Sequence, residues 1–411
     1  MAFSREDSKN SQGLTFKSIL EMQIRGMERS YQTEIDDFFD SNAEGGIALT
    51  TPTDGAFCQA RKKVKHTAFV ELGDCLVDSF YNNNVVRDWN GLRPIAIDGS
   101  TVHVPDTKEN LLHFGAWHPA NSDAPCPKAR VSFAYDPLNK IIVDAIMGPK
   151  SIGEDPMAVQ HLEKLQEGDL CIYDRGYFSF FLMMLHETRA IKYCMRVPQE
   201  QCTTLCEDLL TGEDDIEVYY QPSHYAKKAC READLPFTSL KVRLVKIKLE
   251  SDEYEVLATN IFDESLDISD FKALYHLRWG VEEEYKRMKS RCELEAYSGK
   301  LCEFVYQDFY ADVIRLNLSS ILTRGCRDNL EAEGVKVKHV HAPNMSYALT
   351  KTKQIVATVM NKSWKCLSIL LRIFEVRVKR NSEPIRPGRS FPRVRKPFRS
   401  GRFMEYKHAR C

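Results

Sequence analysis

The chain has 411 residues, enough for two or three domains that each bury a core of their own. Hydrophobic residues make up 43% and charged residues 28% of it, as in ordinary soluble proteins, and no apolar run reaches the ~18–20 residues of a membrane span. The net charge is −1, but residues 377–411 carry +10 and the remainder −11. This basic tail predicts either an arm that neutralises nucleic-acid phosphates or a solvated segment without a fixed partner.

The opening residues and the cysteines indicate the compartment. The sequence MAFSREDSKN is too polar for a secretory signal peptide. Thirteen cysteines at irregular spacings, without a CxxC pair, favour reduced thiols over a disulfide framework. We therefore expect a cytoplasmic protein that does not bind membranes. A zinc site is an alternative use of the thiols, although the spacing of its four candidate ligands matches no standard template: Cys202, Cys206, His224 and Cys230.

Residues 1 to about 90 are expected to form a helical region. Helical apolar spacing runs from Thr15 to Phe39, and a second helix is expected to begin near Thr53 or Asp54, since either side chain can cap it. The second helix carries a cluster of cations, namely Arg61, Lys62, Lys63 and Lys65. These side chains form either a solvated helix face or a surface that follows a DNA backbone.

A sheet is expected from Pro94 onward. PIAIDGSTVHV reads as one strand, and ARVSFAYDPLNKIIVDAIMG as two strands joined by the turn residues Asp-Pro-Leu-Asn. A helix over about 155–165, the strand LCIY, a helix over 178–186 and the strand AIKYCMRV follow. Three consecutive strands and then alternating helices and strands predict a mixed α/β sheet flanked by helices.

The second half of the chain changes character twice. Residues 198–262 contain acidic loops and a hairpin, formed by SLKVRLVKIKL and EYEVLATNIF. Helices are then expected from Asp270 to about Thr323 and from Lys353 to Val376. We therefore divide the chain into residues 1–90, 91–325 with an insertion at about 198–262, 326–376, and the tail 377–411.

Two strands of the expected sheet deliver a carboxylate at their ends. Asp98 follows the apolar run of PIAIDGS, and Asp174 follows that of LCIYDRGY. A glycine within two residues lets the backbone turn after each of them. Strand ends of a helix-flanked sheet are a usual place for chemistry. A single aspartate in this position more often caps a helix or closes a turn, so neither residue is decisive alone.

The segment FKALYHLRWGVEEEYKRMKSRCELEAYSG places further functional groups on one helix face. On a helix advancing 100° per residue, four polar side chains fall within an arc of about 60°: Tyr275, Arg278, Glu282 and Lys289. An apolar stripe lies beside them, formed by Leu274, Leu277, Val281, Tyr285 and Met288. The alternative interpretation is an exposed face with ion pairs such as Arg278–Glu282.

Three carboxylates that converge on one point would require a bound cation. They repel one another and stay ionised together only with cations among them. Hard carboxylate oxygens suit Mg²⁺ or Mn²⁺, and two such ions ~3.5–4 Å apart can activate a water or a 3′-hydroxyl and stabilise the leaving oxygen of a phosphodiester. The guanidinium of Arg278 could grip a flanking phosphate with two hydrogen bonds.

These residues resemble a known family. The spacing Tyr275-x2-Arg278-x3-Glu282-x6-Lys289 resembles the Tyr-Arg-Glu-Lys signature of bacterial insertion-sequence transposases of the DDE type. Asp98 in IDGS and Asp174 in YDRGY are similar to that family's first and second catalytic aspartates, and AFCQARKKV is similar to its N-terminal helix. The resemblance runs from about residue 53 to residue 299.

The resemblance implies a fold and an activity. It implies an RNase H-like catalytic domain over 91–325, with a mainly β insertion, in which Asp98, Asp174 and Glu282 hold two Mg²⁺ or Mn²⁺ ions. It implies cut-and-paste transposition by a homodimer in the bacterial cytoplasm, associated with the nucleoid. The partners would be double-stranded terminal inverted repeats and target DNA. The DNA-contacting side chains would be Tyr275, Arg278 and Lys289, with Arg61, Lys62 and Lys63 in the N-terminal region.

One departure and two alternatives stay open. Relatives that cut through a DNA hairpin use an aromatic residue, notably tryptophan, of the insertion to hold a flipped base. None of the four tryptophans lies between 190 and 262, but tyrosines could replace them: Tyr219, Tyr220, Tyr225 or Tyr254. An RNase H-like nuclease without strand transfer, or a domesticated DNA-binding protein without catalysis, are the alternative functions. The intact carboxylates disfavour the binder, because they would repel phosphate.

Overall fold

The computed structural model describes residues 13–27, 29–43, 46–118, 125–198, 205–206, 209, 212–249, 253–291, 295–334, 340–360 and 364–385. Two units emerge from the contacts within the chain. The first unit comprises Met1–Asn84, Val102–Ala129 and Arg287–Cys411, and the second comprises Val85–Thr101 and Arg130–Lys286.

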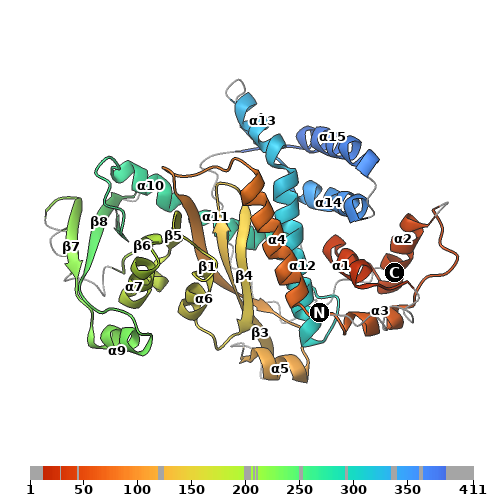
Figure 1. Ribbon diagram of the computed structural model, residues 1–411, viewed down its shortest axis with the longest axis horizontal. Helices are drawn as coiled ribbons and strands as arrows, with labels where there is room; N and C mark the ends of the chain where they lie inside the picture. Colours follow the sequence, from red (N-terminus) through yellow and green to blue (C-terminus); the bar gives the residue numbers. More distant parts are fainter. Residues whose placement is uncertain are drawn as a thin grey trace. The chain divides into compact units, whose positions relative to one another are not determined.

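The second unit is built on a mixed sheet (Figure 1). Its strands are β1 (Arg93–His103), β3 (Cys126–Asp136), β4 (Ile141–Pro149), β5 (Asp169–Tyr173), β6 (Lys192–Arg196), β7 (Asp215–Tyr220), β8 (Leu240–Lys248) and β9 (Tyr254–Thr259). Its helices are α6 (Glu154–His161), η2 (Arg175–Tyr177), α7 (Phe180–Thr188), α9 (His224–Glu232), α10 (Ile268–His276) and α11 (Trp279–Arg291). The first residues of β3 and the last residues of β1 and α11 belong to the first unit.

The strand order identifies the type of sheet. The strands follow one another as β4-β3-β1-β5-β6-β9-β8-β7. The pairs β1–β5 and β5–β6 are parallel, whereas the short turn between β3 and β4 permits only an antiparallel hairpin. The carboxylate of Asp136 closes that turn by accepting the backbone N–H groups of Leu138 and Asn139, each at 2.9 Å. The expected mixed α/β sheet flanked by helices is confirmed.

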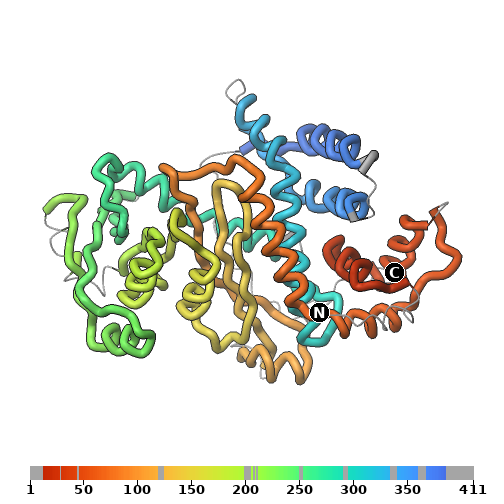
Figure 2. Tube along the Cα trace, viewed as in Figure 1, coloured from red at the N-terminus to blue at the C-terminus, as the bar shows by residue number. Residues whose placement is uncertain are grey.

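The insertion continues the central sheet. Strand β9 pairs antiparallel with β6, from Cys194↔Thr259 to Arg196↔Leu257, and β8 and β7 follow outward (Figure 2). The expected hairpin is therefore present as β8 and β9, and its mainly β character is confirmed. The edge strand β7 and helix α9 were not expected as separate elements. Apolar side chains of β5, β6, β8 and β9 pack under α10 around Phe271 and Leu274.

The first unit is largely helical. It contains α1 (Phe16–Arg25), α2 (Tyr31–Asn42), α3 (Asp54–Arg61), α4 (Thr67–Asn83), α5 (Lys108–Phe114), α12 (Cys302–Leu322), α13 (Arg324–Gly334), α14 (Met345–Met360) and α15 (Trp364–Arg380). Short strand pairs are formed by β2 (Ala116–Trp117) with β3, and by β10 (His341–Ala342) with β11 (Glu383–Pro384). Helix α12 packs against α1, α4 and α14, and α14 packs against α15 (Figure 1).

Several expected helices are divided in the structure. The stretch from Thr15 to Phe39 forms α1 and α2, because the backbone of Gly26 turns with φ 81°. A side chain on Gly26 would collide with the guanidinium of Arg315, so only glycine fits there. Thr53 caps α3 as expected, by accepting the N–H of Ala56, but this helix ends at Arg61. The expected helix over 353–376 is likewise two helices, α14 and α15.

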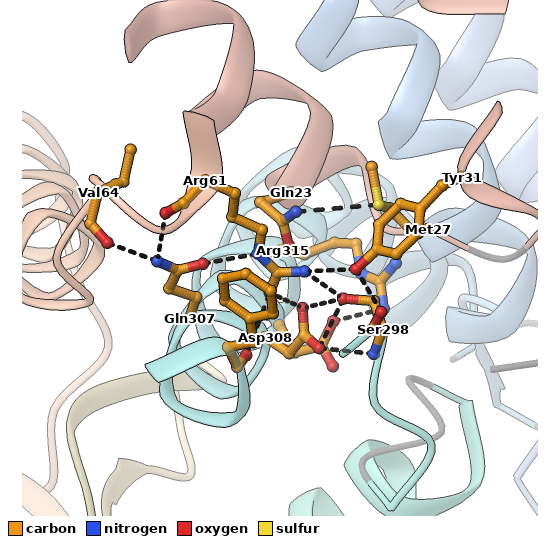
Figure 3. A network of polar contacts seen from close by, with 11 residues as sticks. Gln23, Met27, Tyr31, Arg61, Val64, Ser298, Gln307, Asp308 and Arg315 are labelled. Atoms are coloured by element: carbon orange, nitrogen blue, oxygen red, sulfur yellow. Dashed lines mark hydrogen bonds and ion pairs between the residues drawn. The ribbon is translucent and has the colours of Figure 1, made fainter. Parts of the chain in front are cut away.

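The structure corrects the interpretation of Arg61. Its side chain is fully buried and belongs to a polar network in the interior of the first unit (Figure 3). The guanidinium donates to Gln307 Oε1 at 2.6 Å and to Asp308 Oδ1 at 2.8 Å. It also donates to the Tyr31 hydroxyl at 2.8 Å and to Ser298 Oγ at 2.7 Å. Arg61 thus has no free surface for DNA, whereas Lys62 and Lys63 are exposed.

The described residues contain neither a membrane-spanning helix nor a disulfide. No helix within the described ranges is long and apolar enough to cross a membrane. The described cysteines are all free thiols. Of the alternative zinc ligands, Cys202 lies outside the described residues, and no trio of potential ligands gathers within them. The basic tail is described only as far as Ile385. The N- and C-terminal helices, placed in separate regions from the sequence, share the first unit with α12.

Candidate active site

The two aspartates occupy matching positions on neighbouring strands. The parallel pairing of β1 with β5 runs from Arg93↔Asp169 to Ile97↔Tyr173. Asp98 and Asp174 are the next residue of each chain segment, so both lie just beyond the end of this parallel ladder. Strand β1 itself continues to His103, as predicted for PIAIDGSTVHV, so Asp98 lies within the strand and not at its end. The end of the parallel ladder, not the end of the strand, opens the site.

Asp98 lies in a partly buried environment beside other charges. Burial raises the pKa of Asp98 to about 6, and the nearby negative charges of Glu282 and Glu154 also raise it. The N–H of Gly99 and the charge of Arg278 act in the opposite direction. Asp98 and Glu282 therefore repel each other when both are ionised. The raised pKa also identifies Glu154, whose side chain packs on Gly99, as a carboxylate near the site that the sequence analysis missed.

Asp174 is more exposed and has several hydrogen-bond donors. Its side chain is 38% exposed. Its Oδ1 accepts the backbone N–H of Arg175 at 2.8 Å and the Tyr275 hydroxyl at 3.4 Å. Arg196 of β6 approaches the same oxygen, at 3.8 Å. One face of this carboxylate is thus held by the protein, while the rest faces solvent.

Glu282 does not share one straight helix with Tyr275. The expected helix is divided into α10 and α11, and the N–H groups of Arg278 and Val281 bond to carbonyls only three residues back. This tighter turn places Tyr275 on α10, Arg278 between the helices and Glu282 on the first turn of α11. The chain can start α11 there because Gly280 lies against the β3–β4 turn, where an added Cβ would be 3.0 Å from Pro137 Cβ.

Arg278 is the cation among the carboxylates. Its side chain is 4% exposed, and its Nη1 donates to Glu282 Oε1 at 3.1 Å. Burial lowers the pKa of Arg278, but the charges of Asp174, Glu282 and Tyr275 together raise it above the usual value. The guanidinium also lies over the ring of Trp279, 4.4 Å from its centroid, and Trp279 itself is 47% exposed. Arg278 therefore balances charge that would otherwise repel within the site.

The other candidate DNA contacts belong to the first unit or to the insertion. Lys289 lies near the end of α11 in the first unit, where burial lowers its pKa and Glu295 raises it. Lys62 and Lys63 follow α3 in the same unit and are exposed. Of the tyrosines proposed to hold a base, Tyr219, Tyr225 and Tyr254 are exposed, while Tyr220 packs against Phe178 and Phe180.

The three carboxylates suit a divalent metal by their chemistry, but Glu282 is paired with Arg278 in this structure. Asp98, Asp174 and Glu282 offer hard carboxylate oxygens. Burial, and to a smaller degree the charges of Glu282 and Glu154, disfavour the ionised form of Asp98, and a bound cation would favour it. Within the described residues, however, no three such side chains converge closely enough to form a ready-made metal site. Glu282 is instead turned toward Arg278. The residues fit the metal chemically, provided that Glu282 exchanges its partner.

Two contacts near Asp98 were not expected from the sequence. The hydroxyl of Tyr285 donates to the backbone carbonyl of Asp98 at 2.8 Å, and Ser132 Oγ donates to the same oxygen at 3.2 Å. The sequence analysis placed Tyr285 in the apolar stripe of the helix, and its ring does stack on Phe133. Helical spacing gave no signal for the partner of its hydroxyl.

Comparisons with known proteins found a family model, a curated relative and a solved structure that are similar to this chain. The family model described as the transposase DDE domain matches residues 89–303, a span that contains Asp98, Asp174 and Glu282. A curated relative, transposase InsG for insertion sequence element IS4 of Escherichia coli (strain K12), is 22% identical over 265 residues. These residues cover 64% of this chain and 59% of the relative, so the chain spans less than two thirds of that protein. A cryo-EM structure of a piggyBac transposase synaptic complex with hairpin DNA has a TM-score of 0.44 and 12% identity, over 94% of this chain and 78% of that one.

Proposed function

Because this chain belongs to the transposase DDE domain family, whose model spans just over half of it, we propose that it is a DNA transposase. It cleaves DNA at the ends of an insertion sequence and joins those ends to target DNA, through Asp98, Asp174 and Glu282. The observation that carries the proposal is the arrangement of these carboxylates. The two aspartates follow the last pair of one parallel ladder. Burial raises the pKa of Asp98, and the charge of Glu282 raises it further.

The carboxylates would hold Mg²⁺ or Mn²⁺, two ions per site. When bound, the metal would activate a water or a 3′-hydroxyl and stabilise the leaving oxygen. The protein's own contribution is to orient the three side chains. The Tyr275 hydroxyl holds Asp174, and the tight turn before α11 presents Glu282 beside Arg278.

Cations of both units would bind the DNA backbone. The planar guanidinium of Arg278 can form hydrogen bonds with a carboxylate or a phosphate. It would therefore bind Glu282 in the free protein and a DNA phosphate in the complex. Lys289, Lys62 and Lys63 would contribute further phosphate contacts. The DNA partners would be double-stranded terminal inverted repeats and target DNA, held by a homodimer.

The first test is metal-dependent cleavage by carboxylate variants. Asp98→Asn, Asp174→Asn and Glu282→Gln should each lower cleavage of a transposon-end duplex in Mg²⁺ by at least about a thousandfold, since each removes a metal ligand. Binding of the same duplex, measured in Ca²⁺ or without metal, should change little. Glu264→Gln, which alters an exposed carboxylate before α10, is the matched control. Near wild-type cleavage by any of the three variants would show that the triad is wrongly assigned.

The second test separates a transposase from the two alternatives. Pre-cleaved ends incubated with target DNA and Mn²⁺ should give strand-transfer products with the wild-type protein. Cleavage without any joined product would indicate a nuclease with the same site. Binding of the ends without cleavage or joining would indicate a DNA-binding protein that has lost catalysis.

A further inference from the structure

The backbone carbonyl of Asp98 is held by two hydroxyl groups. Strand β1 pairs with β5 only up to Ile97, so the peptide of Asp98 lies beyond that parallel ladder. Its carbonyl oxygen accepts hydrogen bonds from Tyr285 Oη at 2.8 Å and from Ser132 Oγ at 3.2 Å. The peptide that carries this carboxylate is therefore fixed from a helix, α11, and from a strand, β3.

The Tyr285 arm connects two proposed metal ligands. Tyr285 comes three residues after Glu282 on α11, about one helical turn further. Its ring is buried and stacks on Phe133, with centroids 4.4 Å apart and planes 11° apart. A rigid ring of this kind leaves the hydroxyl little freedom. Its hydrogen bond therefore fixes the position of the helix that carries Glu282 relative to the strand that carries Asp98.

The Ser132 arm is supported by a buried chain of polar side chains. Ser132 Oγ lies 2.9 Å from His161 Nε2, and His161 Nδ1 lies 2.6 Å from Asp144 Oδ2. Ser132 and His161 are fully buried, and the side chain of Asp144 is 9% exposed. A serine, a histidine and an aspartate in this order would suggest a hydrolase, but substrate cannot reach a hydroxyl buried to this degree.

The donors and acceptors of this chain fit a holding role. Ser132 has one proton, which it donates to the carbonyl of Asp98, so its oxygen must accept from His161 Nε2–H. The Nδ1 of His161 faces the carboxylate of Asp144. Burial raises the pKa of Asp144 and the contact with His161 lowers it, with a net decrease. The ammonium of Lys164 lies 3.4 Å from the other oxygen of Asp144. Every member of the chain thus has a partner.

We propose that Tyr285 and the chain Ser132–His161–Asp144 are positioning residues that hold the peptide of Asp98 and so set the distance between its carboxylate and Glu282. The inference rests on the proposed role of Asp98 and Glu282 as metal ligands. The hydroxyl donors act on the backbone, and the carboxylate of Asp98 remains free to bind a cation. Loosening either arm weakens metal binding first and slows cleavage as a consequence.

The experiment compares Mn²⁺ binding to metal-free protein, measured by electron paramagnetic resonance of the free ion. Tyr285→Phe and Ser132→Ala each remove one hydroxyl and keep most of the packing. Each should weaken Mn²⁺ binding about three- to tenfold, the range of one hydrogen bond, and the double variant should weaken it further. Asp144→Asn should act like Ser132→Ala. In cleavage assays at limiting Mn²⁺, kcat should fall while the KM for end DNA stays unchanged.

The control is Tyr193→Phe. Tyr193 is a buried tyrosine of β6 in the same sheet, and its hydroxyl has no hydrogen-bond partner among the described residues. Its removal should leave Mn²⁺ affinity unchanged. Urea unfolding of every variant separates a loss of stability from a loss of metal affinity. If Tyr285→Phe does not fold, Ser132→Ala and Asp144→Asn decide the question through the other arm.

Two results would overturn different statements. If Glu282→Gln abolishes Mn²⁺ binding but Tyr285→Phe and Ser132→Ala bind it like Tyr193→Phe, the positioning role is wrong and the metal site stands. If Glu282→Gln binds Mn²⁺ as the wild type does, the proposed metal site is wrong, and the positioning role falls with it.

Discussion

At the scale of single residues, the site contrasts two aspartates of the same sheet. Asp98 is partly buried beside Glu282 and Glu154, and burial raises its pKa to about 6. Asp174 is 38% exposed and accepts two hydrogen bonds. The ionised carboxylate of Asp98 is therefore strained in the metal-free protein, chiefly by its burial. Replacing it should therefore reveal that strain as a gain in stability.

The metal-free Asp98→Asn variant should be more stable than the wild type at pH 7. A carboxyl whose pKa is higher in the folded than in the unfolded state favours folding in its neutral form, so its contribution is lost as pH rises from about 4 to about 6. A difference of about two pKa units corresponds to at most about 3 kcal/mol. Urea unfolding at pH 7 should show the gain, which should shrink toward pH 4.

Asp174→Asn provides the comparison and should give no such gain. Mg²⁺ should stabilise the wild type and leave Asp98→Asn unchanged, because the variant lacks the ligand. If Asp98→Asn were less stable than the wild type at both pH values, burial of this carboxylate would not be the dominant energy.

Arg61→Met should destabilise the protein strongly. The change leaves the carboxylate of Asp308 without its buried partner, and breaking such a pair costs about 3–5 kcal/mol. Lys62→Met, which alters the exposed neighbour, should change stability by less than about 0.5 kcal/mol. Chemical denaturation measures both. The double variant Arg61→Met/Asp308→Leu should recover part of the loss, and equal stability of the two single variants would contradict the network of Figure 3.

The residues also show what the sequence could and could not reveal. Asp98, Asp174 and Glu282 were predicted from patterns of neighbouring residues: an apolar strand before each aspartate, and helical spacing around Glu282. Arg61 was misplaced because its partner Asp308 is 247 residues away, and a run of cations gives no sign of it. The hydroxyl of Tyr285 was missed for the same reason, since its partner is the backbone of another strand.

At the scale of elements, the start of α11 decides where Glu282 points. Helical spacing predicted one helix, but the chain makes a tighter turn at Leu277 and Arg278. Periodicity did not detect it, since both helices keep their apolar residues toward the protein. The strands were predicted more accurately, because alternation and flanking turns are local signals. Helix α9 was missed inside a segment that the acidic loops dominated.

Gly280→Ala tests the start of α11. The new Cβ would meet Pro137 Cβ at 3.0 Å and Tyr135 Cε1 at 3.4 Å, so the first turn of the helix must shift by a few tenths of an ångström. The higher helix propensity of alanine offsets much of the strain, and stability should stay within about 1 kcal/mol of the wild type. Cleavage should nevertheless fall about tenfold, since Glu282 moves with the turn.

The matched change is Gly325→Ala in α13, where an added Cβ meets no atom within 4 Å among the described residues. It should leave cleavage unchanged and give a small gain in stability. Unfolding curves and single-turnover cleavage rates distinguish the two variants. Wild-type cleavage by Gly280→Ala would mean that the position of this turn does not control Glu282.

At the scale of the whole molecule, the units follow contacts rather than chain order. The sequence suggested separate N- and C-terminal helical regions, whereas α12 packs against helices of both and all three belong to one unit. Local patterns could not reveal this, because each helix is amphipathic whatever it packs against.

The structure also indicates where a deletion of the basic tail should begin. Val378 is buried, and Ile385 donates its N–H to the carbonyl of Val340, so a deletion should begin after Ile385.

Deleting residues 386–411 removes nine Lys/Arg and one Glu and changes the net charge from −1 to −9. Non-specific DNA affinity should fall at low salt, and the slope of log K against log salt should become shallower by about 0.9 for each phosphate that the tail no longer neutralises. Cleavage of bound ends should remain, because the site lies outside the deleted segment. Binding to a scrambled duplex across a salt series measures the effect. A variant whose tail keeps its length but has its basic residues changed to glutamine should behave like the deletion. If it bound DNA like the wild type, the charge of the tail would not contribute to DNA affinity.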